Sequence, residues 1–241
     1  MENDYESSPT VTNCVFSGNR VGNDGGGMHN ANSSPTVENC VFSGNEAMEE
    51  GGGMFNANSS LAMVNCTFSG NKARDEGGGM SNWNSSLAVA NCTFSGNEAG
   101  KEGGGMFNHD SNSMVMNTIL WGNVAPDDSG PDIYQDGLGG TLTLNHCVVG
   151  VYSAQDDSTV KITDLITDDP KLTARDEKDN PPAPSADVYI YKLEDGSSAL
   201  DAGLPVGETI SGDVKVPDVD QLATTRPQGA GVDIGAFERK R

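Results

Sequence analysis

The chain has 241 residues, of which 35 are acidic and 14 are lysine or arginine, so its formal net charge is −21. A charge of this sign and size repels phosphate backbones, and we therefore expect no nucleic-acid partner. No apolar run approaches the ~18 residues that a membrane-spanning helix needs. Residues 1–5 are polar and acidic, unlike a signal peptide.

A unit of 26 residues recurs four times without insertion, beginning at Ser7. Each unit carries Ser-Ser, then Asn-Cys, then Phe-Ser-Gly-Asn, then Gly-Gly-Gly-Met. The cysteine, phenylalanine and methionine of successive units are Cys14, Phe16 and Met28; Cys40, Phe42 and Met54; Cys66, Phe68 and Met80; and Cys92, Phe94 and Met106. Weaker units follow at 115–123 and 133–145. We expect regular coils over residues 7–110 and degenerate coils over 111–150.

The residue types in the unit favour short strands over helices. The units are rich in Gly, Asn, Ser, Val and Thr, and they lack a 3.6-residue periodicity. Three short apolar patches, around Val11, residues 14–16 and Met28, predict three strands per turn. Strands that pair with their counterparts one turn later, at a spacing of about 4.8 Å, form a parallel β-helix. The sequence therefore predicts an all-β solenoid of 26-residue coils.

Alternation along the strands predicts which side chains point inward. Val11, Cys14, Phe16 and Met28 face the interior, so the core should consist of four stacked columns: Val/Met, Cys, Phe and Met. The asparagine before each cysteine breaks the alternation, and asparagine tolerates the left-handed conformation that such a bend needs. We expect these residues to form an amide ladder at the bend: Asn13, Asn39, Asn65, Asn91 and Asn117.

The cysteines are expected to be core residues. Five is an odd number, which excludes a complete disulfide framework. Thiols in a line offer no cluster of zinc ligands around one point, and a free cysteine behaves as a small buried hydrophobic residue.

The repeat dissolves after about residue 150, and we divide the chain into a β-helix over 1–166 and irregular coils with a cap over 167–241. An open end of a β-helix exposes unpaired strand edges, which a cap would cover. Residues 180–184 contain three prolines and are expected to form a loop, whereas residues 188–193 alternate like a strand. No cap precedes Ser7, which predicts an excised fragment or a surface for end-to-end self-association.

Two parts of the sequence resemble known bacterial surface proteins. Phe-Ser-Gly-Asn paired with Gly-Gly-Gly-Met over residues 7–123 resembles the FxxN and GG[AI] repeat of chlamydial polymorphic outer membrane proteins. The C-terminal part resembles the ending of choice-of-anchor Q proteins, through residues 169–172, 191–193, 196–203, 226–227 and 231–238. The resemblance implies a pectin-lyase-like, right-handed β-helix that is exported and displayed at the cell surface. It implies no single activity and no catalytic residues.

An acidic column precedes the glycines. Its members recur at the repeat spacing: Asp24, Glu50, Glu76 and Glu102. Stacked carboxylates repel one another unless they are screened or bridged, and calcium would bridge them because it takes several oxygen ligands. The alternative is a solvated loop face, where the nearby lysines and arginines offset the charge. No compact Asp-x-Asp calcium motif is present.

The outward face of the third strand carries aromatic residues. The candidates for ligand binding are His29, Phe55, Trp83, Phe107, His109 and Tyr134. Exposed rings in a row stack on sugar rings. The alternative is that these side chains stack on one another or are covered by other parts of the protein.

Catalysis would fall where the repeat decays. His109, Asp110 and Asp136 are the candidates, because glycoside hydrolysis needs two carboxylates that flank one bond. The alternative is that these are turn residues that close the fifth coil. We favour a secreted or cell-surface structural or adhesive module that binds glycans. A polysaccharide lyase or glycoside hydrolase and a calcium-stabilised stalk remain open, and no other cofactor is required.

Overall fold

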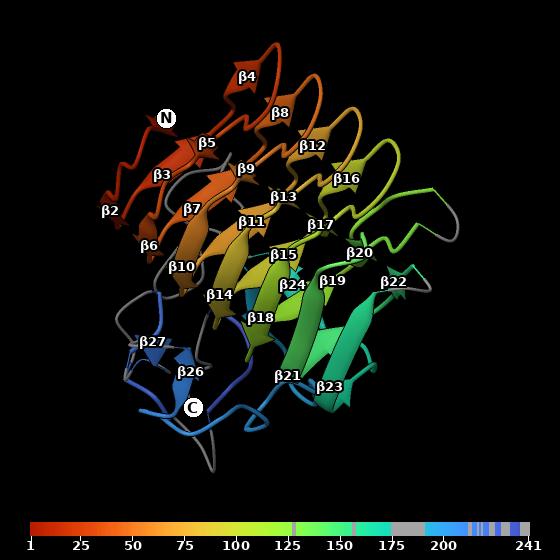
Figure 1. The fold of residues 1–241 in the computed structure, drawn as a ribbon. Helices are drawn as coiled ribbons and strands as arrows, with labels where there is room; N and C mark the ends of the chain where they lie inside the picture. Colours follow the sequence, from red (N-terminus) through yellow and green to blue (C-terminus); the bar gives the residue numbers. More distant parts are fainter. Residues whose placement is uncertain are drawn as a thin grey trace.

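The computed structural model describes residues 1–126, 129–155, 158–174, 191–211, 214–215, 217, 219–221, 225–227 and 232–236. Within these residues every regular element is a β-strand, and none is a helix. The strands stack in parallel from one turn of the chain to the next, which gives a solenoid of about 6 turns with ~26-residue coils (Figure 1). The all-β solenoid predicted from the repeat is confirmed.

The first wall of the solenoid is a 7-stranded parallel sheet that contains the Gly-Gly-Gly-Met strands. Its strands are β1 (Glu2–Asp4), β5 (Met28–Ala31), β9 (Met54–Ala57), β13 (Met80–Trp83), β17 (Met106–His109), β20 (Ile133–Asp136) and β22 (Tyr152–Ala154). The pairing of Glu2 with His29 shows that repeat material precedes Ser7, where the sequence pattern first becomes visible. This first turn has one residue more than the 26-residue repeat, because Asn3 and Asn30 are 27 residues apart. The extra residue hides the similarity of residues 2–4 to the later units.

The second and third walls belong to one 12-stranded sheet, which the long strand β21 joins. The second wall contains β2 (Thr10–Thr12), β6 (Thr36–Glu38), β10 (Ser60–Val64), β14 (Ser86–Ala90), β18 (Asn112–Met116), β21 (Thr141–Val149) and β23 (Thr159–Ile166). The third contains β3 (Val15–Ser17), β7 (Val41–Ser43), β11 (Thr67–Ser69), β15 (Thr93–Ser95) and β19 (Ile119–Trp121).

A fourth short strand in each regular coil was not predicted. These strands are β4 (Arg20–Val21), β8 (Glu46–Ala47), β12 (Lys72–Ala73) and β16 (Glu98–Ala99), and they form their own 4-stranded sheet. The prediction of three strands per turn missed them because each has only two residues. Their outward side chains form cross-strand ion pairs, Arg20 with Glu46 at 3.0 Å and Lys72 with Glu98 at 2.6 Å.

The four predicted core columns are confirmed. Val37, Met63 and Val89, the cysteines from Cys40 to Cys92, and the methionines from Met28 to Met106 are buried. The phenylalanine rings stack nearly parallel, with centroids 4.7 Å apart for Phe16 and Phe42, 4.5 Å for Phe42 and Phe68, and 4.6 Å for Phe68 and Phe94. The cysteines are free and buried, except Cys14, which is partly exposed.

Polar ladders also run through the interior, and sequence reasoning missed them. The asparagine that ends Phe-Ser-Gly-Asn is fully buried in the second, third and fourth units. Its side-chain amide donates to the same amide one turn later, at 2.9 Å from Asn45 to Asn71 and again from Asn71 to Asn97. A second buried ladder runs through Asn30, Asn56 and Asn82, in which each side-chain amide donates a hydrogen bond of 2.8 Å to the next.

The asparagines at the bend adopt the predicted left-handed conformation, with φ of 55° at Asn13 and 53° at Asn39 and Asn65. The predicted amide ladder at this bend is mostly wrong. Among the described contacts, only Asn65 donates to its neighbour Asn39, at 3.1 Å. Asn65 also donates to the Val219 carbonyl at 2.9 Å, and Asn117 accepts from the Leu204 amide at 2.7 Å, so the C-terminal segment occupies these groups instead.

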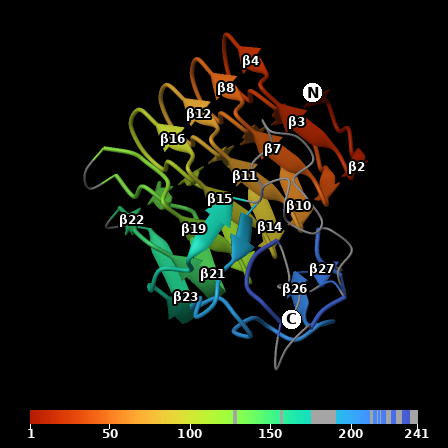
Figure 2. The same ribbon diagram turned by 180° about the vertical axis from the view of Figure 1, so that it is seen from behind.

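The C-terminal segment lies along the flank of the solenoid (Figure 2). We expected it to cover the open end, but its described contacts reach back to early coils: Gln221 donates to the Cys40 carbonyl at 2.7 Å. Its strands are β24 (Leu172–Ala174) with β25 (Tyr191–Leu193), and β26 (Thr209–Ser211) with β27 (Val214–Lys215). The predicted loop at 180–184, and residues 188–190 of the predicted strand, lie outside the described residues.

Candidate ligand-binding face

The register of the first sheet aligns the predicted aromatic column on its outer face. His29 pairs with Phe55, Phe55 with Ser81, Ser81 with Phe107, and Phe107 with Tyr134. Trp83 and His109 pair with each other in the next outward column. These residues align as predicted, because each strand pairs in register with the same strand of the next repeat.

The exposure of this column differs from the prediction. Phe107 is only 2% exposed and Ser81 is fully buried, so the row is not an open line of rings. The rings form two groups. His29 stacks on Phe55 at 5.2 Å, whereas Trp83 lies 4.2 Å from His109 and 5.9 Å from Phe107. Tyr134 stacks on Phe107 at 6.0 Å and extends the second group.

The acidic column and the aromatic column meet. Glu50 reaches from the loop before β9 and accepts hydrogen bonds from the Ser81 hydroxyl, at 2.8 Å, and from the Trp83 indole N–H. Later in the solenoid Tyr134 interacts with Glu102 and offsets part of the rise in the pKa of that carboxyl group. Two features that the sequence placed separately are therefore one surface, with carboxylates beside aromatic rings.

Burial and crowding raise the pKa of the carboxyl groups on this surface. Desolvation raises the pKa of Glu50 most, and Glu76 and Asp24 raise it further, while the bonds from Ser81 and Trp83 lower it. Desolvation also raises the pKa of Glu102, together with the charges of Asp136 and Glu76. The negative charge of Glu76 is partly compensated, since the Lys101 ammonium group lies 3.3 Å from its carboxylate.

This shift predicts the effect of Glu50→Gln on stability. A carboxyl group whose pKa is raised on folding favours the folded state at low pH, and that contribution is lost as pH rises through the folded pKa. Glutamine retains an oxygen that accepts from Ser81 and Trp83. We therefore expect a higher melting temperature than wild type at pH 7, with the gap closing in acid. Glu49→Gln, on the exposed neighbour, should leave the melting temperature unchanged at both pH values. Equal changes in melting temperature for the two variants would contradict the role given to burial of Glu50.

The acidic column does not converge on one point. Among the described residues, Glu2, Asp4 and His29 form the only group of three or more metal-ligating side chains whose ligand atoms lie within 4.8 Å of one another. Asp24 accepts from the Glu50 backbone N–H at 3.0 Å, and Glu50, Glu76 and Glu102 have the separate partners described above. The calcium hypothesis for this column stays a prediction, without a shared coordination point in its support.

His109, Asp110 and Asp136 come together as the sequence suggested. His109 Nδ1 lies 2.8 Å from Asp136, and its Nε2 lies 3.5 Å from Asp110. The carboxylates also accept from backbone amides, Asp136 from Gly137 at 2.7 Å and Asp110 from Gly139 at 3.1 Å. Asp110 has φ of 48°, as a turn residue does. Both imidazole nitrogens face carboxylates, so neither is directed at a substrate as a general base requires.

A groove that the sequence did not reveal lies on another face. It has a volume of about 580 Å³ and crosses the outer surface of the second wall. Small and hydroxyl-bearing side chains line it, among them Ser86, Ala88 and Thr143, together with Lys161. Residues of these types are ordinary on the outer face of a strand, so no sequence signal identified them.

The fold defines a solenoid repeat protein that carries a groove on its second wall and an aromatic and acidic face on its first. Residues 1–120 match the family model described as right handed beta helix region. The match covers just under half of the chain, and it supports a right-handed β-helix fold and so gives the hand of the coil. Comparison with curated proteins finds no match. In the described part of the chain, no helix has the length and apolar character to cross a membrane.

Proposed function

We propose that the protein is an exported or surface-displayed β-helix module with a structural or adhesive role, and that it binds glycans on the outer face of its first sheet. The observation that carries this proposal is the contact between Glu50 and Trp83. Aromatic rings stack on the apolar faces of sugars, and carboxylates accept hydrogen bonds from sugar hydroxyls. The carboxylate also holds the indole in place, which reduces the entropy lost on binding.

The regularity of the coils supports a scaffold role. Four nearly identical coils repeat the same surface, whereas a single tailored active site would need local departures from the repeat. The resemblance to polymorphic outer membrane and choice-of-anchor Q proteins supports export and surface display.

Trp83→Ala tests the glycan proposal. We expect the variant to weaken binding of the best ligand from a glycan array by about fivefold or more, because ring stacking contributes about 1 kcal/mol or more. Titration calorimetry measures the affinity, and quenching of indole fluorescence provides a second signal. Tyr5→Ala is the matched control, since Tyr5 is an exposed ring at 88% but lies outside the site. Equal losses in both variants, or binding unaffected by Trp83→Ala, would contradict the proposal.

A carbohydrate-active enzyme is the second candidate, and the cluster of His109, Asp110 and Asp136 is what favours it. Assays of acidic and neutral polysaccharides for new reducing ends and unsaturated products distinguish the two functions. Turnover that Asp110→Asn abolishes would establish the enzyme in place of the adhesive module.

A further inference from the structure

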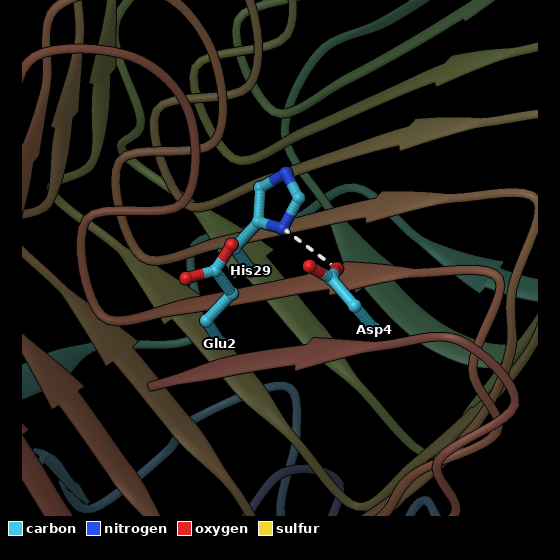
Figure 3. A group of neighbouring side chains, drawn as sticks. All are labelled: Glu2, Asp4 and His29. Carbon is cyan, nitrogen blue, oxygen red and sulfur yellow. Dashed lines mark ion pairs between the residues drawn. The ribbon is translucent and has the colours of Figure 1, made fainter.

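The first two strands of the first sheet bring together three side chains of metal-ligating type. Glu2 and Asp4 lie two residues apart on β1, so both project from the same face. His29 on β5 pairs directly with Glu2. One ligand atom from each of the three residues lies within 4.8 Å of the other two. Figure 3 shows the three side chains as neighbours, with the ion pair between His29 and Asp4 dashed.

Two of the polar atoms in this group lack hydrogen bonds although solvent does not reach them. His29 Nδ1 and Asp4 Oδ1 are closed to solvent and have no hydrogen-bond partner among the described residues. The two atoms face each other at 3.9 Å, which is too long for a hydrogen bond. A buried polar atom without a partner costs free energy. A cation bound between the two atoms would remove this cost for both.

The backbone holds the group in a fixed arrangement. The His29 amide donates to the Met1 carbonyl at 2.9 Å, and the Met1 amine donates to the Gly27 carbonyl at 3.0 Å. Asn3, between the two acids, bonds inward to Asn30 at 2.8 Å. These bonds fix the register of β1 on β5, so the three residues that carry the ligand atoms are held side by side.

The other two histidines show that proximity to carboxylates alone does not produce such a group. The carboxylates around His109 lie on opposite ring nitrogens, at 2.8 and 3.5 Å. His146 contacts Asn145 through Nδ1, at 2.7 Å, and Asp164 through Nε2, at 3.6 Å. In neither case do three ligand atoms converge in the described part of the chain.

We propose that Glu2, Asp4 and His29 bind one divalent transition-metal cation. Two carboxylate oxygens and one imidazole nitrogen leave further positions to water, as in open three-ligand sites. Imidazole suits zinc and its neighbours, whereas calcium takes oxygen ligands. The group therefore selects a cation of the zinc type. This site lies on the same outer face, on β1 and β5, but it shares no residue with the contact between Glu50 and Trp83 that carries the glycan proposal.

Titration of the untagged protein with Zn²⁺ at pH 7.5 tests the proposal. We expect one bound equivalent by calorimetry and a rise in melting temperature that EDTA reverses. His29→Ala should weaken zinc binding at least about tenfold and abolish the rise in melting temperature. Asp4→Asn, which keeps the shape of the side chain, should also weaken it. Circular dichroism without metal checks that both variants fold.

The chain contains three histidines, which supplies matched controls. His109→Ala and His146→Ala should bind zinc as wild type does. Calcium at the same concentration should neither stabilise the protein through this site nor compete with zinc. Zinc binding that survives both His29→Ala and Asp4→Asn, that His109→Ala removes, or that calcium matches would overturn the proposal.

Discussion

Replacing Asn71 with leucine is expected to lower the free energy of unfolding by about 3 kcal/mol or more. Asn71 lies in the middle of a buried ladder. Its amide donates to Phe42 O and to the Asn97 side chain, both at 2.9 Å. Its oxygen accepts from the backbone and side-chain N–H groups of Asn45, at 3.0 and 2.9 Å. Leucine has nearly the same size but leaves about three buried polar groups unpaired, each of which costs about 1–3 kcal/mol.

Asn19→Leu is the matched control, because Asn19 occupies the first, exposed position of the same ladder. Its side chain donates only to Asn45 among the described contacts, at 2.8 Å, and its backbone N–H remains available to that acceptor. We expect its stability to stay within about 1 kcal/mol of wild type. Urea unfolding followed by circular dichroism measures both variants. Equal free energies of unfolding for Asn71→Leu and Asn19→Leu would show that burial does not set how much a ladder asparagine stabilises the fold.

The core columns could be predicted from the sequence because hydrophobicity and spacing agree. Val11, Cys14, Phe16 and Met28 have inward parity within their strands and recur at one interval. The asparagine ladders could not be predicted by that reasoning, since asparagine is usually exposed. Recurrence of Asn45, Asn71 and Asn97 at one position was a signal, but it is equally typical of a turn residue.

The positions of the candidate site were predictable, whereas its exposure was not. A repeat of fixed length aligns Phe55, Ser81 and Phe107 by register alone. Their exposure depends also on non-repeating contacts, such as the one that Glu50 makes from its loop with Trp83. The conformation of a loop side chain cannot be predicted from the spacing of the repeat. The C-terminal segment posed a similar problem, because contacts such as Gln221 to Cys40 span 181 residues and follow no repeat.

The middle glycine of each Gly-Gly-Gly-Met run has a different role from the glycines of ordinary turns. A Cβ added at Gly78 would lie 2.4 Å from the Glu98 carbonyl oxygen and 2.6 Å from the Glu98 nitrogen. These atoms belong to the backbone of β16 in the next coil, so rotation of a side chain cannot relieve the contact. The glycine therefore lets one coil cross closely over its neighbour, and its absence would push the two coils apart.

Gly78→Ala should consequently lower the free energy of unfolding by about 3 kcal/mol, at the upper end of the usual cost of overpacking. Gly22→Ala is the matched control: an added Cβ there meets no atom within 4 Å, and the residue is not left-handed. Its effect should stay within about 1 kcal/mol, and restriction of the unfolded chain favours slight stabilisation. Denaturant unfolding measures the free energy of unfolding of both variants. If both alanines cost the same, loop flexibility rather than close coil contact would account for the glycines.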